Sequence, residues 1–112
     1  MTLQVMLIHN VEILKPTKAI SNAGDEYWSW ANPSRTASKA WINPERTDES
    51  EDPLRDGTQL KTQIFLGPAV FIENQDRIEW EGRVFEVIGK PIQRYTTRGL
   101  HHLEVLTVEL EG

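Results

Sequence analysis

The three histidines and five serines are the side chains most able to carry out catalysis in this sequence. His101 and His102 are adjacent, and neighbouring residues of a strand point to opposite faces, so we do not expect them to bind one metal ion, although His102 and Glu104 would share a face. His9 is predicted to be half-buried on a strand. No serine follows a nucleophile-elbow pattern and no glycine-rich phosphate motif is present. The sequence therefore predicts a protein that is not an enzyme and that uses no cofactor.

Acidic residues are concentrated in one short stretch. Six acidic and two basic residues between positions 45 and 56 give a charge of −4, which leaves −1 for the rest of a chain with a net charge of −5. These acidic residues are Glu45, Asp48, Glu49, Glu51, Asp52 and Asp56. Their spacing is not that of a calcium-binding loop, and such a run is usually a solvated loop. Because no basic patch is visible elsewhere, the sequence does not favour binding to nucleic acid.

Aromatic residues form the other unusual group, and they lie in a polar part of the sequence. They are Tyr27, Trp28, Trp30 and Trp41. Stacking on single-stranded nucleic acid would require more basic neighbours than Lys18, Arg35 and Lys39. We therefore predict that the aromatic residues pack over one end of the fold or, preferably, form a subunit interface, where such side chains dominate the contact energy.

These side chains must be positioned by a small all-β fold. At 112 residues, with 38% hydrophobic and 26% charged residues, the chain fits a single domain over 1–112. Strands are expected at 3–14, 35–43, 58–66 and 103–110, with long polar loops projecting at 17–34 and 44–57. A two-stranded ribbon is the alternative for 17–34. About six strands without a helical period indicate a small antiparallel β-barrel or sandwich. The sequence has no cysteine, no signal-peptide pattern and no apolar run long enough for a membrane span.

A β-hairpin between Asp76 and Pro91 is the best specified element. Gly89 and Pro91 are expected to end its second strand, and residues 93–102 are expected to turn the chain. If Glu81-Gly82 is its two-residue turn, with glycine supplying a positive φ, Ile78 lies opposite Phe85 and Arg77 lies opposite Glu86. The strand patterns predict a core of Val5, Leu7, Val11, Ile13, Leu60, Ile64, Leu66, Ile78, Trp80, Phe85, Val87, Val105 and Val108.

The order of these features resembles the head-tail connector proteins of tailed bacteriophages, in particular the head-closure (stopper) subunit. The resemblance runs over nearly the whole chain and is carried by VEILKPT, WSW with the following NP, DRIEWEGRVFEVIGKP and HHLEVLTVELEG. The hairpin is its most specific part, although similar hairpins occur in tail-completion proteins. The end of the chain lacks the basic pair that many members of the family carry there.

The resemblance implies a structural virion protein that forms a homo-oligomeric ring of six or twelve copies, between a portal-adaptor protein and a tail protein. In that family a long loop closes the lumen and retains packaged double-stranded DNA, and the loop at 44–57 matches it by position. The acidic residues would then face DNA without adhering to it. The implied location is the virion, after assembly in the host cytoplasm. A tail terminator or completion protein, and a single-stranded nucleic-acid-binding barrel, remain the alternatives.

Overall fold

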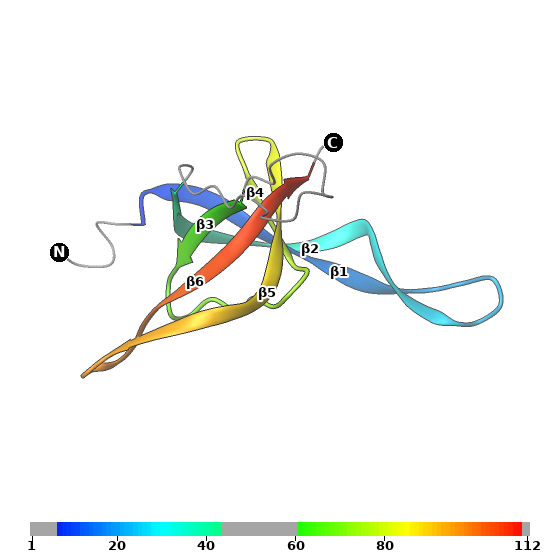
Figure 1. The fold of residues 1–112 in the computed structure, drawn as a ribbon. Coiled ribbons are helices and arrows are strands. Elements are labelled where there is room, and N and C mark those ends of the chain that lie inside the picture. Colours follow the sequence, from blue (N-terminus) through cyan, green and yellow to red (C-terminus); the bar gives the residue numbers. More distant parts are fainter. Residues whose placement is uncertain (1–6, 44–60, 111–112) are drawn as a thin grey trace, which may run out of the picture.

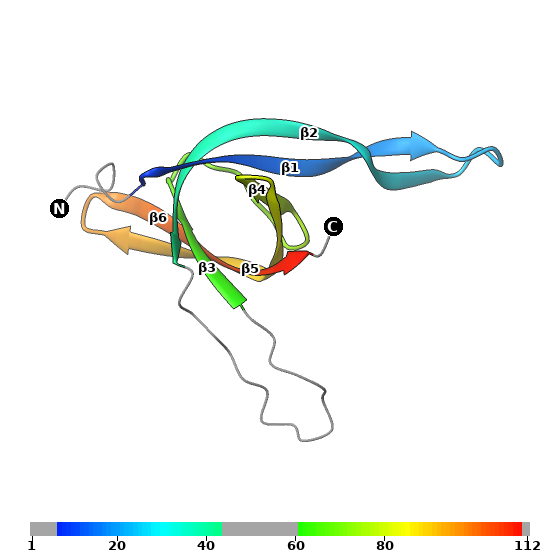
Figure 2. The same ribbon diagram turned by 90° about the horizontal axis from the view of Figure 1, so that it is seen from above.

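The computed structural model describes residues 7–43 and 61–110, which form one antiparallel sheet of six strands and contain no helix (Figure 1). The strands are β1 (His9–Ile20), β2 (Glu26–Asn43), β3 (Lys61–Leu66), β4 (Arg77–Trp80), β5 (Arg83–Thr96) and β6 (Gly99–Leu110). Their order is β1-β2-β3-β6-β5-β4, and β4 pairs with β1, so the sheet closes into a barrel (Figure 2). Closure removes the free edges from the barrel wall. The predicted all-β fold class is confirmed.

The first two strands are much longer than predicted, and beyond the barrel they form a two-stranded arm, here called the first arm (residues 17–29). The stretch 17–34 is a two-stranded ribbon and not a loop. Cross-strand pairs such as Lys18↔Trp28 and Ile20↔Glu26 continue along it up to the turn that joins β1 to β2. Chain reversal is confined to residues 21–25, where Gly24 has a φ of 89°. The pairing shifts between Lys15 and Thr17, and Pro16 lies at this shift. Proline cannot donate to a strand ladder, so it marks an irregularity here and does not end the strand.

A second arm (residues 89–101) is formed by β5 and β6. The sequence pattern placed the end of a strand at Gly89 and Pro91 and a turn over residues 93–102, but β5 continues to Thr96 and β6 starts at Gly99. The register shifts between Ile88 and Ile92, so glycine and proline again accompany an irregularity within a strand. The two arms leave the barrel on opposite sides (Figures 1 and 2).

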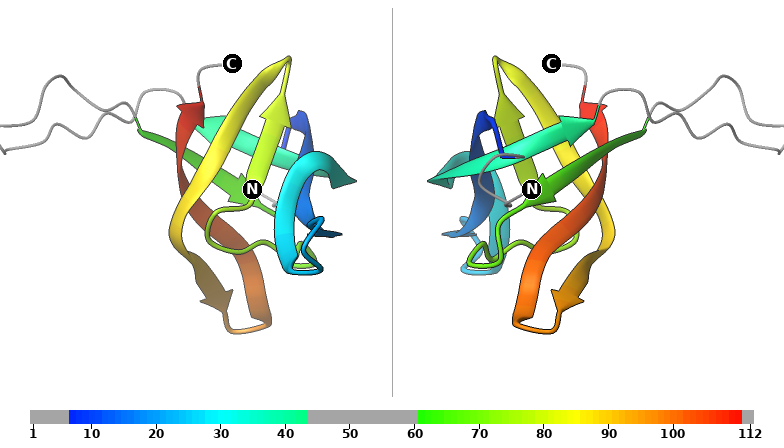
Figure 3. Two further views of the ribbon diagram at one scale, coloured as in Figure 1. Left: turned by 90° about the vertical axis from the view of Figure 1, so that its right-hand side faces the viewer. Right: turned by 90° about the vertical axis from the view of Figure 1, so that its left-hand side faces the viewer.

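The β4–β5 hairpin has the predicted register. Trp80 pairs with Arg83, Ile78 with Phe85 and Arg77 with Glu86. Glu81 and Gly82 both have positive φ, at 51° and 77°, which is the geometry of a type I′ turn. Figure 3 shows this hairpin completing the barrel wall next to β1.

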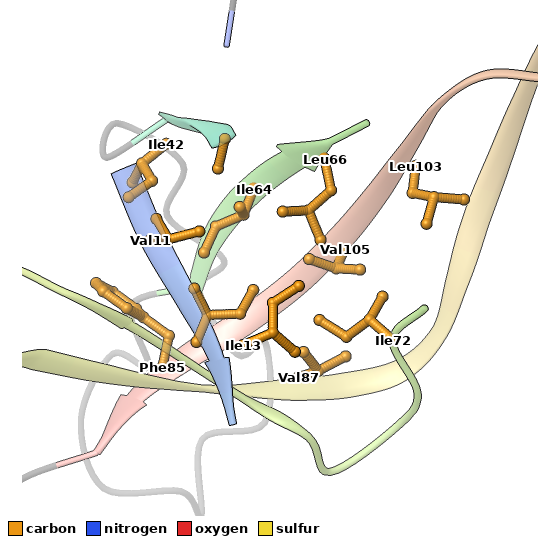
Figure 4. Close-up of a cluster of buried hydrophobic side chains, with 12 residues drawn as sticks. Val11, Ile13, Ile42, Ile64, Leu66, Ile72, Phe85, Val87, Leu103 and Val105 are labelled. Atoms are coloured by element: carbon orange, nitrogen blue, oxygen red, sulfur yellow. The ribbon is translucent and has the colours of Figure 1, made fainter. Parts of the chain in front are cut away.

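The core fills the inside of the barrel (Figure 4). Eight predicted members are buried, namely Val11, Ile13, Ile64, Leu66, Ile78, Phe85, Val87 and Val105. Leu7 and Trp80 are half-buried, and Val5 and Leu60 lie outside the described residues. The prediction of Val108 was wrong, because residues alternate along β6 and the inward position next to it belongs to Thr107. Further buried positions that the prediction omitted are Leu14, Ala40, Ile42, Ile72 and Leu103.

Candidate assembly surfaces

Large apolar side chains are exposed along the first arm. Trp28 is 64% exposed and Ile20 is 72% exposed, and their positions in the register place them diagonally on one face of the arm. Lys18 shares this face, where its Nζ lies 5.4 Å from the centre of the Trp28 ring and 3.6 Å from Oε2 of Glu26. Tyr27 is exposed on the opposite face. The arm thus presents aromatic and aliphatic surface to solvent in the isolated chain.

Trp30 marks the place where the first arm joins the barrel. It is half-buried, and Cζ of Arg77 lies 3.9 Å from the centre of its ring. Next to it is a hollow of about 380 Å³ lined by Trp28, Trp30, Lys15 and Asp76. The arm therefore leaves the barrel from a packed base.

Asp76 is the buried acidic group of this base, with 7% of its surface exposed. Its carboxylate forms an ion pair with Lys15 and accepts a hydrogen bond of 2.8 Å from the backbone N–H of Glu73. Its backbone carbonyl accepts a further bond of 2.8 Å from the N–H of Val87. Since buried charge is costly without partners, this set of bonds ties β1 to the loop before β4.

Trp41 is not brought together with the other three aromatic residues. It lies half-buried in the barrel part of β2 and stacks on Phe65, with ring centres 4.9 Å apart. The ring of Phe65 in turn lies beside the ring of His102, with ring centres 5.6 Å apart. The predicted aromatic set is therefore split between the first arm and the outside of the barrel.

The second arm carries another set of exposed apolar side chains, which the sequence analysis missed. Tyr95 is 65% exposed, Ile92 is 50% exposed and Ile88 is also exposed. A hollow of about 440 Å³, here called the second-arm groove, lies between this arm and the loop that follows β3. Its walls include Phe71, Pro91, Gln93 and Leu100, and Lys90 also lines it. Because a strand end and a turn were expected at these residues, the sequence did not predict the two strands of this arm.

His101 and His102 lie side by side, contrary to the expectation of opposite faces. Arg94 pairs with His102 and Tyr95 with Leu100, so His101 is the extra residue of a bulge, which lets consecutive side chains point the same way. The two Nδ1 atoms are 2.8 Å apart. Burial lowers the pKa of His102 below its usual value, nearby His101 and Arg94 lower it further, and Glu104 opposes the shift.

Other predicted features have simpler outcomes. His9 is half-buried as expected, and its Nδ1 accepts a hydrogen bond of 3.1 Å from the N–H of Ile42. Within residues 7–43 and 61–110, no three acidic or histidine side chains are placed to hold a metal ion, and no helix could span a membrane. The acidic residues predicted to face the lumen, Glu45, Asp48, Glu49, Glu51, Asp52 and Asp56, lie outside the described residues.

Comparison with known proteins gives matches in structure. No protein-family model and no curated protein sequence matches the chain. A chain from the virion of a native gene transfer agent particle has a TM-score of 0.61 and 14% identity, with 92% of this chain and 94% of that chain covered. The phage-like element PBSX protein xkdH from Bacillus subtilis has a TM-score of 0.52 and 17% identity, with the same coverage of 92% and 94%. Protein SF1141 from Shigella flexneri 2a has a TM-score of 0.60 and 24% identity, with 93% of each chain covered.

These matches cover more than nine tenths of both chains in each pair, so the likeness in fold extends over nearly the whole chain. One of the three proteins is a chain of a virion particle and another belongs to a phage-like element. The resemblance noted in the sequence is thereby confirmed at the level of the fold.

Proposed function

We propose that this chain is a structural subunit of a tailed-phage-like particle, and that it acts at head closure, as a ring between a portal-adaptor protein and the tail. The observation that carries the proposal is the pair of arms with exposed apolar side chains on a closed barrel. The fold shared with a virion chain supports it.

Ring formation is supported by the position of the two arms. An arm made of two strands is marginally stable in water and gains stability when its apolar face is covered by another chain. Because the arms leave the barrel on opposite sides, contacts through them join one subunit to a different surface of the next (Figure 2). Such contacts produce a closed ring when the rotation between subunits closes. A ring of six or twelve copies is the form that we propose.

DNA retention is proposed for the segment 44–57, which connects β2 to β3. Its net negative charge suits a wall or plug that contains packaged DNA without adhering to it, because like charges repel at short range. Deletion of residues 48–52 is expected to leave particles that lose DNA more readily. Equal DNA retention in deleted and intact particles would remove the gating role while leaving the ring role open to its own test.

Particles assembled without this chain provide the test of the function as a whole. We expect filled heads without tails, and the addition of purified chain should restore tail attachment. The effect should be absent when the chain is added to heads that lack the portal-adaptor protein. If the chain instead binds only to the end of isolated tails and not to heads, it is a tail terminator or completion protein and the head-closure role is wrong.

A further inference from the structure

The first arm carries a compact face at its tip that no other described part of the chain covers. Ile20 and Trp28 are both exposed on this face, together with the ion pair between Lys18 and Glu26. Asp25, in the adjoining turn, is also exposed. We call the side chains of Lys18, Ile20, Glu26 and Trp28 the tip face. Two large apolar side chains exposed together on a two-stranded arm indicate a contact surface.

The second-arm groove has the complementary character. Its volume of about 440 Å³ can receive one or two large side chains, and Phe71, Pro91 and Leu100 give it apolar walls. Lys90, which also lines the groove, is exposed and has no acidic partner within the described part of the chain. The tip offers a matching charge, because Asp25 is exposed and forms no ion pair with another described residue, whereas Lys18 and Glu26 already pair with each other.

A chain cannot fill its own groove with its own tip. The tip of the first arm and the second arm lie on opposite sides of the barrel in Figures 1 and 2. A second copy can supply the tip, and its own groove then remains free for a third copy. The contact is therefore heterologous, and repeated contacts of this kind lead to a ring or an open chain.

We propose that the tip face of one copy packs into the second-arm groove of the next copy, with Ile20 and Trp28 as apolar anchors. This inference rests on the proposed ring function and adds to it the two surfaces that meet. Each subunit then contributes one tip and one groove, and Asp25 of the tip can approach Lys90 of the groove.

Engineered disulfides test the contact directly, because the chain contains no cysteine. Asn22→Cys places a thiol in the exposed turn of the first arm and leaves both anchors in place, and Gln93→Cys places one in the groove. We expect the double variant to form a ladder of covalent multimers on oxidation, whereas neither single variant cross-links. A control pair, Asn22→Cys with Thr36→Cys, joins the tip to an exposed position on β2 outside the groove and should give no ladder.

Assembly is measured on the same samples by native mass spectrometry, with the purified chain and with the portal-adaptor assembly. Multimers that assemble but cross-link only through the control pair, or through Asn22→Cys alone, would overturn the tip-to-groove contact and leave the ring function intact. Failure to assemble under either condition would overturn both.

A substitution at an anchor gives an independent measurement. Trp28→Ala is expected to raise the concentration needed for half-assembly at least ~10-fold, in line with the loss of a central aromatic contact. Ile8→Ala is the matched control, because Ile8 is equally exposed at 64% and belongs to neither surface. Equal effects of the two substitutions, with both variants folded by circular dichroism, would contradict the proposed anchor.

Discussion

At the scale of single residues, Asp76 is the polar group on which the base of the first arm depends. Asp76→Ala removes the partner of Lys15 and the acceptor of the Glu73 N–H, so we expect the free energy of unfolding to fall by about 2–4 kcal/mol. Glu12→Ala is the matched control, because Glu12 pairs with Arg35 at the surface and its loss should cost less than about 1 kcal/mol. Urea unfolding of both variants measures the difference, and equal losses would show that Asp76 is an ordinary surface acid.

His102 gives the molecule a stability that depends on pH. Its pKa is lowered in the folded chain by burial, beside Phe65 and among His101, Arg94 and Glu104. The unfolded chain therefore binds more protons just below pH 6.5, the ordinary value of histidine, and the free energy of unfolding falls as the pH decreases from there through the folded pKa. His102→Gln should remove this contribution to the dependence of the free energy of unfolding on pH. If the free energy of unfolding, measured between pH 7 and 5, changed equally with pH in both proteins, the assignment to His102 would be contradicted.

At the scale of elements, the β4–β5 turn is stabilised by one glycine and strained by its neighbour. Gly82→Ala is expected to cost about 1–2 kcal/mol, because φ is 77° and no atom lies near enough to add a clash. Glu81→Asn should stabilise the chain by up to about 1 kcal/mol, since Glu81 has a φ of 51° and asparagine tolerates this region better. Thermal unfolding tests both, and a stabilising Gly82→Ala would show that the turn is of another type.

The same hairpin shows why some elements could be predicted from the sequence and others could not. Its turn residues, its alternation and its cross-strand pairs are all local and agree, so the register of Ile78 with Phe85 followed from the sequence. The long strands of the arms were not predicted, because Pro16, Gly89 and Pro91 are residues that end strands in most sequences. Here they mark register shifts inside long strands, which only the pairing with a neighbouring strand reveals.

The candidate site was predictable in part for a related reason. Tyr27 and Trp28 are exposed on the first arm, and they could be singled out as contact candidates because aromatic residues in a polar stretch are conspicuous. Trp41 looked the same in sequence but lies on the barrel against Phe65, and Tyr95 lies in a segment that was taken for a turn. The histidine pair depends on a bulge at His101, which no sequence period indicates.

At the scale of the whole molecule, a closed barrel carries two arms on opposite sides. The barrel wall has no free strand edge, whereas the arms have free edges and exposed apolar side chains. This division suits a subunit whose stability resides in the barrel and whose contacts reside in the arms. Variants of the arms should therefore change assembly with little change in the unfolding of the barrel.

The mass of the purified chain, alone and mixed with a portal-adaptor assembly, tests the central claim most directly. Native mass spectrometry should find one closed stoichiometry, six or twelve copies, bound to that assembly. A chain that stays apart from the assembly and instead binds single-stranded DNA, with an affinity that falls steeply as salt is added, would contradict the ring function and favour a nucleic-acid-binding barrel.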